Sequence, residues 1–251
     1  MRVAIIGGGL VGRLAAWAVM QSGHSSTIFD RMYEKVAKAP RGFVYMHEAC
    51  GLPLRPQLVT VIEQGTAEEY TKKVYQGGPS APTAGEVSFG KYGGVRECYD
   101  PGELLGILNG LQHGMVQEHN FVDLEEILNL LYEYDRLVFT LPINSFIKGN
   151  WPFRKGSVGA WPLDPGEEGM ANFCVYNSSP EIPWHRSGAM FGWAFREFPA
   201  VVPGHQPIIK VIDGDKPPTY KNVLFTGRFG AWRKKQLSHE SYTEVLNWLD
   251  A

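Results

Sequence analysis

The chain of 251 residues is long enough for one large domain or two smaller ones, and its 44% of hydrophobic residues is ordinary for a globular protein. Charged residues make up 20% of the chain and the formal net charge is −2 at pH 7, which excludes a general electrostatic attraction to nucleic acid or anionic membrane and leaves room only for local patches. No apolar run approaches the roughly 20 residues that span a membrane.

The first predicted element is a short strand that ends in a glycine-rich turn. Residues 3–6 are apolar and mostly β-branched, which predicts a strand buried on both faces. Gly7, Gly9 and Gly12 then complete the pattern G-x-G-x-x-G. In a dinucleotide-binding turn the first glycine allows the tight turn, the second lets a pyrophosphate approach the backbone, and the third lets the next helix pack close to the strand.

A helix and a second strand follow this turn. Residues 10–21 contain no proline, which predicts a helix that starts at Leu10 and points its first N–H groups at the turn, where a phosphate can accept from them. Residues 27–29 predict the second strand; Asp30 at its tip can accept hydrogen bonds from a ribose diol, with Arg31 beside it. Glycine-rich turns are common, but here strand, helix and acid all fall where dinucleotide binding needs them, which favours that interpretation over a structural turn.

The next segment turns into a short apolar run that Arg41 and His47 flank. Both side chains can face a cofactor edge, although an exposed arginine and a structural histidine are the open alternatives. Residues 58–62 predict a strand, residues 66–75 a short helix or strand, and residues 87–96 a strand or hairpin outside the nucleotide-binding core.

Two helices and a strand are predicted in the middle of the chain. Asp100 and Asp123 are each followed three residues later by a glutamate, the pattern of a helix N-terminus, and an apolar helical face follows each pair. These carboxylates are therefore interpreted as caps rather than as catalytic groups. Residues 136–142, RLVFTLP, predict another buried strand that ends at its proline.

Residues 143–207 hold four of the seven tryptophans and much of the proline. Strands are expected over residues 173–176 and 189–195, and the loop between them carries Trp184 and Arg186. Aromatic faces stack on planar ligands and arginine pairs with phosphate or carboxylate, so this loop suits the wall of a substrate site. A second hydrophobic core built from Trp and Phe is the open alternative.

The C-terminal end predicts a second strand-turn-helix unit. Residues 222–226 predict a strand, residues 227–230 a tight turn, and residues 238–250 a helix that Ser238 can cap. A flavin gains negative charge on its pyrimidine carbonyl when it is reduced, and a helix N-terminus stabilises that charge. A plain nicotinamide-binding fold does not require this second unit, whereas a flavin does.

The three cysteines, Cys50, Cys98 and Cys174, are far apart and lack C-x-x-C spacing. Buried free thiols are expected rather than a disulfide framework or a metal site, as in a reducing cytoplasm. The strand and phosphate turn begin at the second residue, which leaves no room for a signal peptide, so a cytoplasmic protein is expected.

The two ends of the chain together resemble a flavoprotein superfamily. The opening motif is similar to the nucleotide-binding signature of amine oxidases, protoporphyrinogen oxidase and UDP-galactopyranose mutase, whose usual ribose-binding acid is Glu where this chain has Asp30. The closing NVLFTGRFGAWRKKQLSHESY is similar to the flavin-contacting end of the mutase group, in which Gly-Arg replaces the commoner Gly-Asp. RLVFTLP matches the strand that precedes the crossing into the substrate domain, and the middle of the chain matches poorly.

The resemblance implies an α/β fold, with a discontinuous Rossmann-like FAD-binding domain and a small α+β substrate domain. The FAD-binding domain would comprise residues 1–45, 99–142 and 219–251, and the substrate domain residues 46–98 and 143–218. Within the first domain, the glycines of the opening motif and Asp30 would bind the ADP half of FAD. The ribityl chain and flavin ring would be held by Gly227, Arg228 and the backbone of Gln236, Leu237 and Ser238.

The chain is much shorter than typical family members. Such compact flavoproteins resemble those of bacteriophage DNA-hypermodification clusters, which are associated with cleaving a glycine-derived amino group attached to thymine. The resemblance implies an FAD-dependent oxidoreductase or lyase that cleaves a C–N bond of an amine. His47, Trp184 and Arg186, chosen from their positions in the sequence, are the candidate catalytic residues. Its expected substrate is a small molecule or a modified base, free or within DNA.

Two other functions stay open at this point. A sugar-nucleotide mutase needs paired arginines for its diphosphate, and Arg154, Arg186 and Arg196 are the candidates. A non-catalytic dinucleotide-binding module is compatible with the low count of reactive side chains. The sequence leaves the oligomeric state open.

Overall fold

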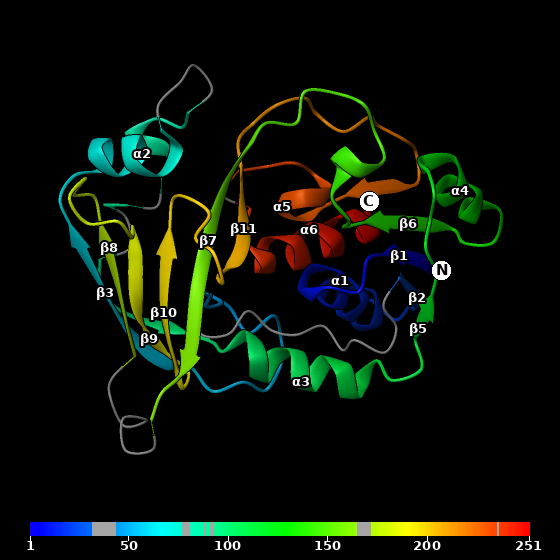
Figure 1. Ribbon diagram of the computed structural model, residues 1–251. Helices are drawn as coiled ribbons and strands as arrows, with labels where there is room; N and C mark the ends of the chain where they lie inside the picture. The colour runs from blue at the N-terminus through cyan, green and yellow to red at the C-terminus, as the bar shows by residue number, and fades with distance from the viewer. Residues whose placement is uncertain (32–43, 77–80, 88, 91–92, 165–171, 235) are drawn as a thin grey trace.

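The computed structural model describes residues 1–31, 44–76, 81–87, 89–90, 93–164, 172–234 and 236–251 (Figure 1). In this part of the chain, a five-stranded sheet with helices on it and a seven-stranded sheet lie next to each other. No helix in the described ranges combines the length and the apolar character that crossing a membrane requires. Cys50, Cys98 and Cys174 are buried free thiols, as predicted.

The five-stranded sheet is parallel throughout. Its strands, in spatial order, are β12 (Val223–Phe225), β6 (Arg136–Phe139), β1 (Arg2–Ile6), β2 (Ser25–Asp30) and β5 (Val116–Glu118). Because parallel strands need crossover connections, helices cover both faces of such a sheet. The predicted α/β class is therefore confirmed.

The alternation of side chains along β1 explains why that strand is apolar throughout. Val3 and Ile5 point to one face, where they pack against helices α1 (Leu10–Gln21) and α6 (Ser238–Asp250). Ala4 and Ile6 point to the other face, into a cluster that includes Ile127 of α4 (Leu124–Asn129). All four strand side chains are fully buried, which is why a central parallel strand has no polar position.

The seven-stranded sheet is mixed. Its strands, in spatial order, are β11 (Gln206–Val211), β7 (Phe153–Pro162), β10 (Trp193–Phe198), β9 (Arg186–Met190), β8 (Asn172–Asn177), β3 (Gln57–Gln64) and β4 (Gly94–Cys98). Only the β3–β8 pair is parallel among these described strands. Helix α2 (Ala67–Tyr75) packs on this sheet through Tyr70 and Val74.

The remaining elements are short or peripheral. Helix α3 (Pro101–Leu111) packs beside α1, and Asp100 caps it by accepting a hydrogen bond from the Gly102 N–H at 2.7 Å, as predicted. The other short elements are η1 (Ala84–Glu86), η2 (Leu130–Tyr132), η3 (Ile143–Ser145) and the four-residue α5 (Gly227–Gly230).

Strands of the five-stranded sheet come from residues 1–45, 99–142 and 219–251, and those of the seven-stranded sheet from residues 46–98 and 143–218. The chain thus enters the parallel sheet three times. The bounds of the two domains themselves stay a prediction.

Three local predictions were wrong in detail. Residues 189–195 form two strands rather than one, because Phe191 and Gly192 adopt positive φ angles of 53° and 78° and reverse the chain between β9 and β10. Ser238 does not cap α6, since it is already the first helical residue; Glu240 instead accepts a hydrogen bond from the Leu237 N–H at 2.7 Å. Over the described part of residues 87–96, regular strand begins only at Gly94.

The close approach of α1 to β1 predicts the effect of a side chain at Gly12. A Cβ there would lie 1.7 Å from the Gly7 carbonyl oxygen, so Gly12→Val must push the helix away from the strand. We expect urea denaturation to show a loss of at least about 2 kcal/mol of unfolding free energy. Gly106→Ala in α3 is the matched control, since its Cβ would meet no heavy atom within 4 Å, and it should add about 0.5–1 kcal/mol. Equal stability of Gly12→Val and wild type would contradict the close packing.

Candidate functional site

The predicted glycine turn lies at the carboxyl end of β1. Gly7 has a φ angle of +106°, which favours glycine, and a Cβ on it would lie 2.6 Å from the Thr140 Oγ1. That hydroxyl donates to the Ile6 carbonyl oxygen at 2.8 Å, so the end of β6 buttresses the turn. Gly12 allows the close approach of α1 described above. Both glycines are therefore required by the local backbone, whatever the turn binds.

Gly9 is different, because no described residue lies against it. A Cβ on Gly9 would meet no heavy atom within 4 Å. Gly9 is the N-cap of α1, no side chain caps it, and the first turn of α1 has no acidic residue. The N–H groups that start at Leu10 thus face an open approach, which is the arrangement that receives a phosphate at a helix N-terminus.

Asp30 and an unpredicted arginine flank the same turn. The Asp30 Oδ2 accepts a hydrogen bond from the Gly8 N–H at 2.6 Å, which fixes the carboxylate beside the turn. Arg13 is buried, and its Nε donates to the Gly8 carbonyl oxygen at 3.3 Å. Burial lowers the pKa of Arg13, although nearby Asp30 favours its charge. The signal that could have found Arg13 is its position: it is the one charged residue within an otherwise uncharged helix.

The C-terminal glycine turn meets the N-terminal one. Gly227 has a φ angle of +79°, and a Cβ on it would lie 2.9 Å from the Val11 Cγ1 in the first turn of α1. Arg228 follows in α5, directly after β12. The two strand-turn-helix units from opposite ends of the chain therefore converge at one place, as the resemblance implies for a cofactor that spans both.

The linker between α5 and α6 is held by a partly buried network around Glu244. The Glu244 Oε2 accepts from the Thr226 hydroxyl at 2.6 Å and from the Gln236 Nε2 at 2.9 Å, and its Oε1 pairs with the Arg233 Nη1 at 2.9 Å. The Gln236 side chain is thus occupied in positioning the linker. Contacts of Gln236 to a ligand would have to come from its backbone, which is what the resemblance implies.

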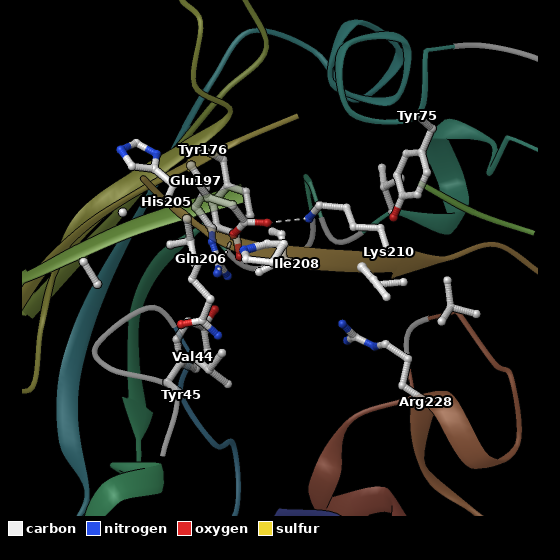
Figure 2. Close-up of a pocket in the computed structure, with 18 of the residues that line it drawn as sticks. Val44, Tyr45, Tyr75, Tyr176, Glu197, His205, Gln206, Ile208, Lys210 and Arg228 are labelled. Carbon is white, nitrogen blue, oxygen red and sulfur yellow. Dashed lines mark ion pairs between the residues drawn. The ribbon is translucent and has the colours of Figure 1, made fainter. Parts of the chain in front are cut away.

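A cavity of about 1110 Å³ opens between the seven-stranded sheet and α5 (Figure 2). Its wall takes residues from strands β7, β8, β9, β10 and β11, from α2 and from the segment before β3. Many of these side chains are aromatic or positively charged. Those on which the following argument depends are Tyr45, His47, Tyr70, Tyr75, Tyr176, Arg186, Glu197, Lys210, Arg228 and Leu237.

Glu197 is the centre of the charged part of this wall. Its side chain is only 3% exposed. The carboxylate contacts the Arg186 Nη2 at 2.7 Å, the Lys210 Nζ at 2.7 Å and the His185 Nε2 at 3.0 Å. Burial by itself would raise the pKa of Glu197, but Arg186 and Lys210 outweigh it and hold that pKa well below its ordinary value. Glu197 is therefore an ionised carboxylate shared by two cations.

His185 adds no charge to this cluster. Its side chain is fully buried, and burial lowers its pKa to about 4 despite the neighbouring Glu197 carboxylate. A neutral imidazole whose Nε2 carries the proton donates to Glu197, and the Nδ1 has no hydrogen-bond partner among the described residues. His185 thus orients Glu197 rather than neutralising it.

Arg228 is a charged side chain of the cavity wall that has no ion-pair partner among the described residues. Among the described residues no carboxylate or carbonyl pairs with its guanidinium, which is half-buried and points into the open space beside Lys210 and Tyr75 (Figure 2). Burial lowers the pKa of Arg228, while Tyr75 and Glu197 partly oppose this effect. A half-buried cation without a partner is costly in the protein alone, so the site favours an anionic ligand.

The structure brings several predicted residues together and leaves others apart. The glycine turn, Leu10 and Asp30 form one group, and His47, Arg186, Arg228 and Leu237 line the cavity. Trp184 lies partly exposed in the loop before β9 and is not part of the cavity wall. Arg31 is exposed just past β2, Ser238 starts α6, and Arg41 lies outside the described residues.

His47 has aromatic neighbours at the cavity edge. Its ring meets Tyr45 edge to face at a centroid distance of 5.1 Å, and His239 at 5.8 Å. Burial, with His239 and Arg96 nearby, lowers the pKa of His47. These contacts suit a neutral histidine at neutral pH.

The residues that sequence reasoning missed are those that converge only in the fold. Glu197 lies on β10, and His185 lies directly before β9. Lys210 lies on β11, a strand that the sequence did not predict. Tyr75 comes from the last turn of α2. No local spacing links these positions, and the order of strands in the sheet is what brings them to one wall.

Solved structures of similar fold include an FAD-containing monooxygenase, another oxygenase and a mutase. The chain is similar over 98% of its length to a protein of Photorhabdus luminescens subsp. laumondii TTO1 assigned as an FAD-containing monooxygenase, with 11% identity, 86% of that chain covered and a TM-score of 0.53. It is similar to the tetrameric form of 2-methyl-3-hydroxypyridine-5-carboxylic acid oxygenase (12% identity, 98% and 80% covered, TM-score 0.57). It is also similar to reduced UDP-galactopyranose mutase (10% identity, 99% and 93% covered, TM-score 0.52).

No protein-family model matches the chain, and no curated protein sequence matches it either. At 10–12% identity the structural likeness shows the fold.

His185→Gln tests the charge state of the buried histidine. Between pH 6.5 and the folded-state pKa of about 4, the unfolded chain binds a proton at His185 that the folded protein excludes. The folded state of the wild type therefore loses stability as the pH falls through this window, by up to about 1.4 kcal/mol per pH unit from this residue. We expect urea denaturation at a series of pH values to show that the difference in unfolding free energy between wild type and variant shrinks with this slope as the pH falls. A difference independent of pH would contradict the neutral state of His185.

Proposed function

We propose that the protein is an FAD-dependent oxidoreductase that oxidises a C–N bond of an amine substrate. The observation that carries this proposal is the convergence of two glycine turns, from opposite ends of the chain, beside a cavity with an unpartnered cation. The fold shared with flavoproteins supports it. The residues present also fit the cofactor, because Gly9 faces open space at an uncapped helix N-terminus.

The residues that would hold FAD fall into two groups. Gly7, Gly9 and the N–H groups from Leu10 onward would bind the pyrophosphate, with Asp30 at the ribose. Gly227, Arg228 and the backbone of residues 236–238 would hold the ribityl chain and the flavin ring. FAD bound there supplies a two-electron acceptor for hydride from the carbon beside the amine nitrogen.

The cavity wall suits an amine that reacts in its neutral form. Arg228 and Lys210 raise the local positive potential, which disfavours a protonated amine and so favours the neutral amine that can release hydride. Burial raises the pKa of Tyr75 and of Tyr176, so both phenols stay protonated and can donate hydrogen bonds without adding charge. The roles of the protein are then to orient the amine and to exclude bulk water.

We propose a glycine-derived secondary amine on a pyrimidine base as the substrate, either free or within DNA. Oxidation of the glycine methylene would give an imine, and water would hydrolyse the imine to an aminomethyl base and glyoxylate. The resemblance to compact flavoproteins supports this choice, and the aromatic lining of the cavity suits a planar base.

A sugar-nucleotide mutase is the second candidate, favoured by the likeness to UDP-galactopyranose mutase. The three arginines that were its candidates are not brought together among the described residues. Arg186 lines the cavity but is paired with Glu197, the Arg154 Nε donates to the Tyr75 carbonyl oxygen at 3.2 Å, and Arg196 is exposed on the sheet. This arrangement disfavours the mutase.

Anaerobic reduction by a candidate amine tests the proposed function. The purified protein is mixed without oxygen with carboxymethylaminomethyl-uracil, and the flavin absorption and released glyoxylate are followed. We expect loss of the oxidised flavin band, glyoxylate in proportion to reduced flavin, and turnover when dioxygen is admitted. Flavin that stays oxidised with this amine, while UDP-galactopyranose is isomerised after chemical reduction, would replace the proposal by the mutase. A purified protein without flavin would leave only a binding module.

A further inference from the structure

The cavity wall carries an excess of positive charge that bears on which substrate it binds. Arg186 and Lys210 share the single carboxylate of Glu197, so this cluster keeps one positive charge in excess. Arg228 adds a second cation that has no partner among the described residues. Glu86, the other described carboxylate in the lining, is itself paired with the Lys234 Nζ at 2.7 Å.

The excess charge also faces the cavity. Glu197 is only 3% exposed, whereas the side chains of Arg186 and Lys210 are 16% and 21% exposed. The carboxylate therefore lies behind its two cations, and a ligand that enters meets their positive side. His185 donates to Glu197 from within the sheet and does not reach the ligand side, since it is fully buried.

Among the described residues of the lining, no unpaired carboxylate compensates this charge. The phenols of Tyr45, Tyr70 and Tyr176 have pKa values raised by burial, so they remain neutral donors. Two cations held on one buried anion are stable only if a further negative charge or water satisfies them. An anionic group on the ligand provides that charge in a site where little water competes.

We propose that Lys210 and Arg186, positioned by Glu197, form a carboxylate-binding subsite for the substrate, and that Arg228 remains with the cofactor. This inference rests on the proposed function for the identity of the reacting amine, but the subsite itself requires only that carboxylates bind in the cavity. The carboxylate is the favoured anion because one excess charge and two donors of Lys210 and Arg186 match its single charge and two oxygens. Lys210 and Arg186 contact the substrate, and Glu197 is a positioning residue.

Paired acids and amides test the subsite independently of turnover. The cofactor-containing protein is titrated calorimetrically with benzoate and benzamide, and with N-benzylglycine and N-benzylglycinamide. Each pair has the same shape and differs in charge. We expect each acid to bind at least about tenfold more tightly than its amide. Equal affinities within both pairs, or no binding of either member, would overturn the subsite.

Three variants test whether Lys210 is responsible for the preference for acid over amide. Lys210→Met should bring the acid close to the affinity of the amide while leaving the amide unchanged, and Lys210→Arg should retain most of the preference because it keeps the charge. Lys155→Met is the matched control, since Lys155 is exposed on β7 and is not part of the lining; it should bind both ligands as the wild type does. An unchanged acid-to-amide ratio in Lys210→Met would overturn the role of Lys210.

The reduction potential of the bound flavin separates this subsite from a role toward the cofactor. If the excess charge serves the reduced flavin instead, Lys210→Met lowers the potential and leaves the acid preference intact, which contradicts the proposal. Loss of the acid preference without a matching loss of potential supports it. Persistence of the acid preference in a protein whose flavin no amine reduces would keep the subsite and reject amine oxidation, so the two failures are distinguishable.

Discussion

The close contact between α1 and the end of β1 is the constraint on which the rest of the structure depends. Only a glycine at position 12 lets the helix approach the Gly7 carbonyl, and this contact aims the uncapped helix N-terminus at the open space beside Gly9. Gly227 then packs against Val11 of the same helix. One packing contact thus sets the position of both glycine turns and, through Arg228, of one end of the cavity.

The sequence was sufficient where the local fold depends on neighbouring residues. The glycine turn, the position of Asp30 and the cap at Asp100 each follow from a few consecutive residues, and the structure places all three accordingly. The reversal at Phe191 could not be predicted, because a non-glycine residue there adopts a positive φ angle. Trp184 is an aromatic residue of the kind that lines substrate sites, but it is not among the residues that line the cavity.

The charged wall could not be predicted for a different reason. Glu197 forms a charged cluster only because His185 and Lys210 contact it. These residues are not neighbours in the sequence, and the order of strands in the seven-stranded sheet brings them together. Period-two alternation explains why Glu197 is buried while Arg196 beside it is exposed. A buried carboxylate with two cations is a costly arrangement for stability alone, which is why its placement on a cavity indicates binding.

Cofactor retention by Gly9→Val tests the central claim, that the glycine turn receives the pyrophosphate of FAD. Gly9 has extended backbone angles that valine adopts, and its Cβ direction is open, so the cofactor-free variant should melt at the same temperature as the cofactor-free wild type. The account predicts that mass spectrometry of the cofactor released on denaturation finds FAD from the wild type and almost none from the variant. FAD retained in full by folded Gly9→Val, or its absence from the wild type, would contradict the claim.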